Sequence, residues 1–90
     1  MRKCYNCGST NSIELHHVFF NRGQRKISDR HGFTVDLCSI CHRSQPQGVH
    51  GGNKELDLKL KRICQEEYEQ THTRDEFMKL IGRNYRGDIS

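Results

Sequence analysis

The chain has 90 residues, of which 32% are hydrophobic and 29% are charged, with no Trp and a formal net charge of +4. This length fits one small domain, and so few apolar side chains predict that folding needs a metal, disulfides or a partner. No run approaches the roughly 20 apolar residues that span a membrane, and no apolar leader precedes the first cysteines. We therefore expect a reduced, cytoplasmic protein without a membrane partner.

The excess positive charge lies in one half of the chain. Residues 1–50 hold seven Lys or Arg against three Asp or Glu, whereas residues 51–90 hold eight of each. The first half also contains all but one of the cysteines and five of the six histidines. This asymmetry favours a polyanionic partner for the first half, with an ordinary solvated basic surface as the alternative.

The first half of the chain predicts two strands. Ile13–Phe20 is rich in β-favouring residues, and Ile13, Leu15 and Phe19 are expected on one face. The polar stretch 21–26 is expected to form a loop, and 27–32 is either irregular or a helical turn that ends at Gly32. Residues 33–37 alternate again and predict a second strand that pairs with the first.

The second half of the chain predicts helices. A brief helix is expected to follow Cys38 and to stop before Pro46. Asn53 is a good N-cap for a helix reaching about Thr71. Residues 73–76 match a capping box that opens a shorter helix ending near Gly82, and residues 84–90 are expected to form a loose tail.

The cysteine spacing predicts a structural zinc site. Cys4 and Cys7 form one C-x2-C pair, Cys38 and Cys41 form a second, and four thiolates suit tetrahedral Zn²⁺. A redox dithiol is disfavoured because neither pair lies in a βαβ pattern. Haem attachment is disfavoured although Cys41 precedes a histidine, because it requires export and leaves the first pair without a role. The fifth cysteine, Cys64, is expected to be a small buried apolar residue.

Four histidines form a second constellation. His16 and His17 are adjacent on the first predicted strand, His42 follows the last thiol, and His50 lies in the irregular segment beyond it. Phosphodiester hydrolysis needs a base to activate water and a cation near the leaving oxygen, and neutral imidazole can supply the base and help bind the cation. His31 and His72 are assigned structural roles.

The order of these motifs carries a resemblance to a known family. C-x-x-C-G, then Glu14-Leu15-His16-His17-Val18, then Leu37-Cys38-x-x-Cys41-His42 resembles the zinc-containing HNH endonucleases, most of all their small phage-encoded members, over about residues 4–50. The resemblance implies an α+β fold with a zinc-stabilised ββα-metal core at residues 1–52 and two C-terminal helices at 53–90. It also implies that His17 is the general base and that His16 and His42 bind the catalytic ion, Mg²⁺ or another divalent metal.

Two positions depart from the family pattern. The histidine expected one helical turn after His42 is replaced by Pro46, and His50 is the nearest substitute as a metal ligand. The central Asn of the family corresponds to Phe33, with Thr34 and His31 as the two candidates to replace it.

Basic side chains between and beyond the predicted strands are candidates for contacts to a nucleic-acid backbone. Such contacts give affinity without sequence preference. The candidates are Arg22, Arg25, Lys26, Arg30 and Arg43.

The sequence thus predicts a metal-dependent endonuclease that hydrolyses DNA phosphodiester bonds. The alternative is a non-catalytic zinc module of the same descent that binds nucleic acid or acts as a protein adaptor. The sequence does not distinguish DNA from RNA or single from double strands. It also leaves open whether a protein partner or a homodimer is needed; the apolar stripe within residues 56–68 could serve either the core or such an interface.

Overall fold

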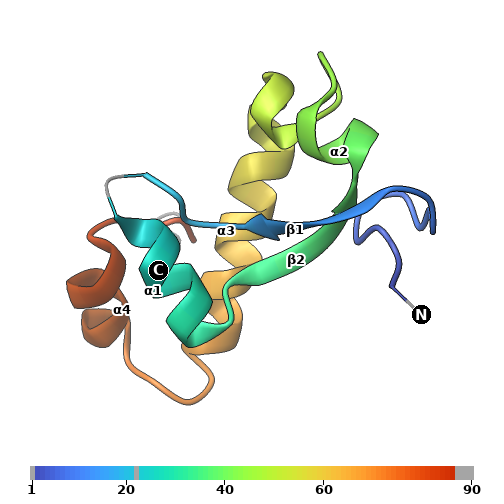
Figure 1. Ribbon diagram of the computed structural model, residues 1–90. Coiled ribbons are helices and arrows are strands. Elements are labelled where there is room, and N and C mark those ends of the chain that lie inside the picture. The colour runs from blue at the N-terminus through green and yellow to red at the C-terminus, as the bar shows by residue number, and fades with distance from the viewer. Residues whose placement is uncertain (1, 22, 87–90) are drawn as a thin grey trace.

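A computed structural model of the chain describes residues 2–21 and 23–86. Its elements follow the order strand, helix, strand, then three further α-helices with one 3₁₀ turn among them (Figure 1). They are β1 (Ile13–His17), α1 (Gln24–His31), β2 (Thr34–Cys38), α2 (Ser39–Arg43), η1 (Val49–Gly51), α3 (Lys54–Tyr68) and α4 (Arg74–Ile81). The expected α+β class is confirmed, with a two-stranded sheet and four α-helices among the described residues.

The two strands pair antiparallel, from Ile13 opposite Cys38 to His17 opposite Thr34. This register places the end of β1, where His16 and His17 lie, far along the ladder from the cysteine at the end of β2. The expected shared face extends in β1 only over Ile13 and Leu15, and Leu15 is 49% exposed, whereas His16 on the opposite face is 1% exposed. Phe19 is buried for another reason, because the strand ends at His17 and the chain then turns into the core.

The prediction of a loop at residues 21–26 was wrong from Gln24 onward, where α1 begins. Gly23, with φ of 83°, precedes the helix, and Gly32, with φ of 71°, ends it. Ser28 anchors the helix to the segment after β1, because its fully buried hydroxyl donates to the Phe19 carbonyl and accepts from the Phe19 amide. The resulting helix lies against the end of the sheet that carries the histidines.

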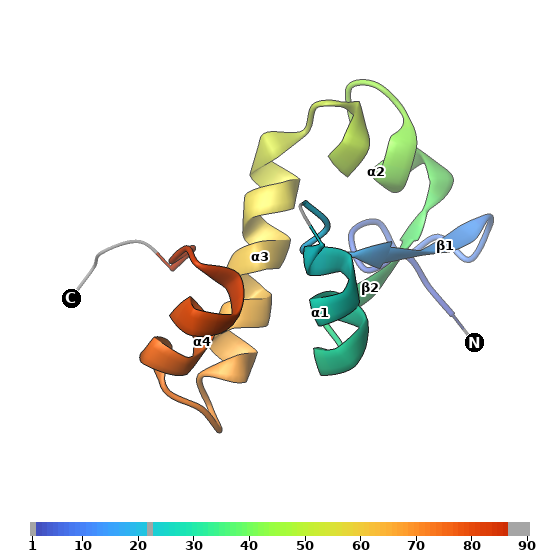
Figure 2. The same ribbon diagram turned by 60° about the vertical axis from the view of Figure 1, so that its left-hand side comes forward.

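The helices of the second half match their sequence signals. Asn53 caps α3 by accepting a hydrogen bond from the Leu56 amide, and Thr73 forms the predicted capping box with Glu76. Helix α3 ends at Tyr68, three residues before the expected Thr71. It crosses behind the strands, and α4 lies beside its C-terminal half (Figures 1 and 2). None of the helices in residues 2–21 and 23–86 has the length and apolar character needed to cross a membrane.

An aromatic cluster forms the core between these elements. The Phe19 ring lies 5.4 Å from Phe33, 5.9 Å from Phe77 and 5.6 Å from Tyr85, measured between centroids. Phe33 is therefore a core residue that is 5% exposed.

The expected loose tail is wrong for residues 84–86. The fully buried Gln65 donates to the Asn84 side chain at 2.8 Å and accepts from the Tyr85 amide at 2.7 Å. Arg86 pairs with Glu69 at 2.6 Å. These contacts hold the segment after α4 against α3, while residues 87–90 of the predicted tail lie outside the described residues.

Candidate metal centres and the histidine hollow

The two cysteine pairs come together at one end of the sheet. Tyr5 donates its amide to the Asp36 carbonyl of β2, which places the Cys4–Cys7 turn beside the second pair at the β2–α2 junction. Ligand atoms of Cys4, Cys7, Cys38 and Cys41 all lie within 4.8 Å of one another, and all four are free thiols. The Cys7 and Cys38 sulfurs are 3.6 Å apart, close to the roughly 3.8 Å that tetrahedral zinc–thiolate bonds of about 2.3 Å require.

Local backbone geometry explains why each pair can present two sulfurs together. The Cys4 sulfur accepts from the Cys7 amide and the Cys38 sulfur from the Cys41 amide, both at 3.5 Å. Gly8, with φ of 80°, completes the first turn. Burial raises the pKa of Cys4, but backbone hydrogen bonds together outweigh it and lower this pKa to about 6. The lower pKa favours the thiolate that a metal needs. Burial raises the pKa of Cys41 to about 12, so a metal would have to displace the proton of this thiol. Together the four sulfurs could hold a metal ion such as zinc.

A second cluster contains three of the predicted histidines. Ring nitrogens of His16, His42 and His50 lie within 4.8 Å of one another, and the ring centroids are 4.9–5.2 Å apart. They come from β1, α2 and η1, and they line a hollow of about 350 Å³ together with His17. The adjacent residues His16 and His17 can both reach it because His17 is the last residue of the strand.

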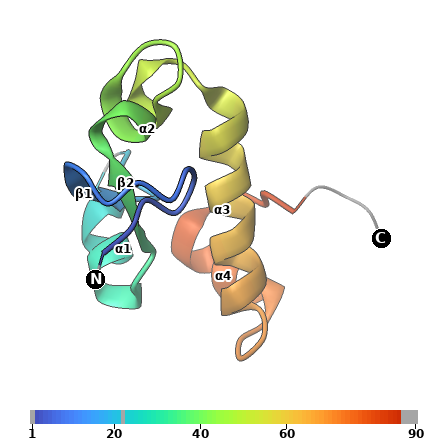
Figure 3. The same ribbon diagram turned by 90° about the vertical axis from the view of Figure 1, so that its right-hand side faces the viewer.

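Two glycines place His50, whose role the sequence left open. A Cβ on Gly48 would lie 2.7 Å from the backbone of Arg43 and Ser44, and a Cβ on Gly51 would overlap the Ser44 carbonyl. Only glycine therefore lets η1 pack so closely against the end of α2. Figure 3 shows α2, η1 and the start of α3 gathered at the same end of the molecule.

The environment of His16 fits a metal ligand. Both of its ring nitrogens are buried and neither has a hydrogen-bond partner among the described residues. Burial first, and then the neighbouring His42 and His50, lowers the pKa of His16 to about 3, so the ring is neutral and keeps a lone pair for a cation. Burial and His42 also lower the pKa of His50. An unpartnered buried polar group is costly and is expected to have a ligand.

Carboxylates contact two further histidines that line the hollow, His42 and His17. Glu14 accepts from His42 Nδ1 at 2.7 Å and pairs with Arg43 at 2.6 Å, and these contacts lower the pKa of Glu14. This contact leaves His42 Nε2 for the cluster and resembles the carboxylate–histidine pairs that support metal ligands. Asp29 on α1 lies 2.6 Å from His17 Nε2.

Sequence reasoning missed both carboxylates. Glu14 lies two residues before His16, and the period of two in a strand places these residues on one face, so this partner could have been found. Asp29 could not, because its position depends on α1, which the sequence left ambiguous. The side chain bonded to the His17 ring is thus neither Thr34, which pairs with His17 across the sheet, nor His31, whose ring lies 5.7 Å from that of Phe33.

The predicted basic residues are distributed over two helices. Arg25, Lys26 and Arg30 are exposed on α1, and Arg25 lines the histidine hollow. Arg43 is on α2 and is paired with Glu14. Arg22 lies outside the described residues.

Comparisons of the chain with protein-family models, with curated proteins and with solved structures found no match. The functional argument therefore rests on the geometry of the two clusters.

The cysteine cluster predicts that Cys41→Ala loses the bound zinc whereas Cys64→Ala keeps it. Both cysteines are buried, but Cys64 lies on α3 and is not part of the cluster. Metal analysis should find one fewer zinc per chain in the first variant, with loss of cooperative unfolding, because metal binding and folding are coupled in small domains. Equal zinc content in the two variants would contradict the assignment.

The buried, unpartnered ring of His16 predicts that His16→Leu stabilises the protein when only the cysteine cluster carries metal. Removing an unsatisfied buried polar group should raise the free energy of unfolding by about 1–3 kcal/mol. Denaturant unfolding at pH 7 with one equivalent of zinc measures the change.

The same variant should also alter the pH dependence of stability. The unfolded His16, with a pKa near 6.5, takes up a proton that the folded residue does not take up until about pH 3. Wild-type stability should therefore fall as the pH drops below 6.5, by at most about 1.4 kcal/mol per pH unit from this residue. A constant difference between the two proteins from pH 7 to pH 5 would argue against a buried neutral His16.

Proposed function

We propose that this protein is a metal-dependent endonuclease of the HNH type that hydrolyses DNA phosphodiester bonds. The observation that carries the proposal is the gathering of His16, His42 and His50 in one hollow with His17, with both nitrogens of His16 buried and unpartnered. A purely structural histidine would be expected to bond through at least one nitrogen. The motif order in residues 4–50 supports the same class.

The three imidazoles of His16, His42 and His50 are a donor set for a cation that keeps open positions for substrate or water. Imidazole suits transition-metal ions, whereas Mg²⁺ prefers oxygen ligands. We therefore favour a transition-metal dication over Mg²⁺ among the ions expected from the sequence. When bound, such an ion would supply positive charge to stabilise the departing oxyanion.

His17 is the proposed general base. In this mechanism Asp29 accepts a hydrogen bond from Nε2–H of His17, and the tautomer with that proton leaves Nδ1 with a lone pair. His17 Nδ1 would take a proton from water, the water oxygen would attack phosphorus, and the bond from phosphorus to the leaving oxygen would break. Arg25 lines the same hollow and is available for a non-bridging phosphate oxygen.

The proposal predicts that wild-type protein nicks supercoiled plasmid with added Mn²⁺, Ni²⁺, Zn²⁺ or Mg²⁺ and that His17→Ala loses activity. Loss of a general base should reduce the rate by about 10²- to 10⁴-fold. His72→Ala is the matched control, because His72 is exposed and stacks on Tyr68 outside the hollow.

Zinc content and folding of all three proteins should be established first. Equal nicking by wild type and His17→Ala would mean a different base or a contaminant. Absence of nicking with every ion, while DNA still binds, would favour the non-catalytic binding module instead.

Asp29 gives a second test of the same mechanism. Asp29→Ala should lower kcat by about ten- to a hundredfold through misorientation of His17, with little change in KM. Asp29→Asn should retain most of the activity, because the amide oxygen still accepts from Nε2–H. Since Asp29 is on the surface, with a side chain that is 65% exposed, neither change should unfold the protein. Equal activity of the Ala variant and wild type would rule out a positioning role.

A further inference from the structure

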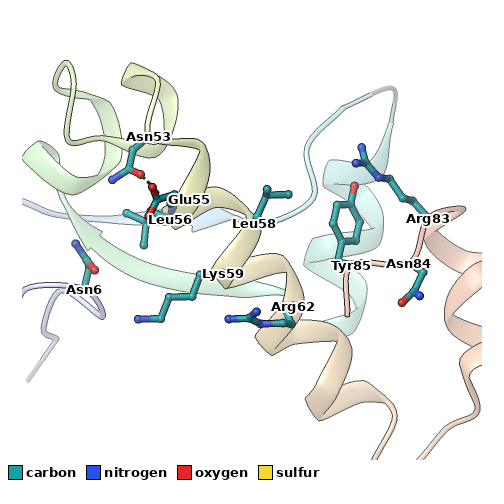
Figure 4. Close-up of a pocket in the computed structure, with 10 residues that line it drawn as sticks. All are labelled: Asn6, Asn53, Glu55, Leu56, Leu58, Lys59, Arg62, Arg83, Asn84 and Tyr85. Atoms are coloured by element: carbon teal, nitrogen blue, oxygen red, sulfur yellow. Dashed lines mark hydrogen bonds between the residues drawn. The ribbon is translucent and has the colours of Figure 1, made fainter. Parts of the chain in front are cut away.

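A larger hollow of about 720 Å³ lies along α3, apart from the histidine hollow. Figure 4 shows Lys59 and Arg62 projecting from α3, with Arg83 and Tyr85 on the segment that follows α4. We call it the α3 hollow. The basic residues Lys59, Arg62 and Arg83 line it together with a single carboxylate, that of Glu55.

The three basic side chains are available to a ligand. Lys59, Arg62 and Arg83 are exposed, and within residues 2–21 and 23–86 none of them pairs with a carboxylate. Among the described residues, three other cations of the second half are paired: Lys61 with Asp57 at 2.9 Å, Arg74 with Glu69 at 3.2 Å and Arg86 with Glu69 at 2.6 Å. The net neutral composition of residues 51–90 therefore conceals a local positive surface.

The α3 hollow is close to the histidine hollow. The Lys61 ammonium lies 5.4 Å from the centroid of the Phe20 ring and 5.4 Å from that of the Tyr85 ring. Phe20 lines the histidine hollow and Tyr85 lines the α3 hollow. Lys61, whose side chain is only 9% exposed, therefore contacts one lining residue of each hollow.

We propose that the α3 hollow binds the phosphate backbone of a nucleic-acid strand that continues past Phe20 and Tyr85 to the histidine hollow. Three unpaired cations in a recess suit a ligand with repeated negative charges. The exposed apolar Leu58 adds surface for sugars and bases, and the Arg83 guanidinium lies 5.1 Å from the centroid of the Tyr85 ring, which helps to position this cation in the hollow. This inference rests on the proposed function for the kind of ligand, but the site contains none of the residues assigned to cleavage.

The experiment is a salt titration of DNA binding by the full-length, zinc-loaded chain. Fluorescence anisotropy with a labelled DNA oligonucleotide, without a second divalent ion, gives the affinity of wild type and of Lys59→Gln, Arg62→Gln, Arg83→Gln and the triple variant. Each single change should lower the slope of log K against log salt by about 0.7–0.9, and the triple change by about 2–3. At 0.1 M salt, each lost contact should weaken binding by roughly five- to eightfold.

Lys79→Gln is the matched control, since it removes one exposed cation that has no carboxylate partner within the described residues, but from α4 and outside the hollow. Its affinity should change by less than about twofold. Equal losses in Lys79→Gln and Arg62→Gln, or wild-type affinity in the triple variant, would overturn the inference, as would absence of DNA binding by wild type.

The inference and the proposed function fail in different assays. If the triple variant binds DNA as wild type does, the α3 hollow is not a DNA site, and the loss of nicking in His17→Ala still stands. If His17→Ala nicks like wild type, the cleavage mechanism fails while the salt slopes remain. Comparison of single- and double-stranded oligonucleotides of the same sequence identifies which form the α3 hollow accepts.

Discussion

The approach of two cysteine pairs, 31 residues apart between Cys7 and Cys38, is the contact on which the candidate site depends. The large aromatic residues of the core cluster around Phe19, whereas α2 and η1 add only Cys41 and Val49 to the buried hydrophobic residues. So little apolar packing gives weak stabilisation at the end that carries His42 and His50. A metal held by the four thiols would tie the N-terminal turn to the β2–α2 junction and so stabilise the position of α2, which carries His42.

The histidine hollow shows the opposite relation between stability and function. His16 is buried and has no hydrogen-bond partner among the residues that the structure describes, a local conflict that a chain selected only for stability would replace by an apolar residue. The carboxylates around it, Glu14 and Asp29, fix the two neighbouring imidazoles from outside. The residue with no support of its own is therefore the one most in need of a ligand.

The ion pairs of the fold determine which basic residues are available to a polyanionic partner. Arg43, expected to contact nucleic acid, is bonded to Glu14 and helps to fix that carboxylate beside His42. Lys59, Arg62 and Arg83, from the half of the chain without net charge, gather in the α3 hollow and pair with no carboxylate of residues 2–21 and 23–86. Net charge along a sequence indicates the kind of partner, but the contact surface depends on which charges are neutralised by neighbours.

The sequence by itself determined the features that depend on short spacing: the two cysteine pairs, the pairing of two strands, the Asn53 and Thr73 caps and the adjacency of His16 and His17. Local hydrogen bonding and side-chain periodicity are sufficient for these. Only the tertiary structure decided that His16 faces inward, that α1 brings Asp29 to His17, and that Gly48 and Gly51 bring His50 beside His42. Each of these depends on packing between segments distant in sequence, where burial in the assembled fold outweighs local propensity.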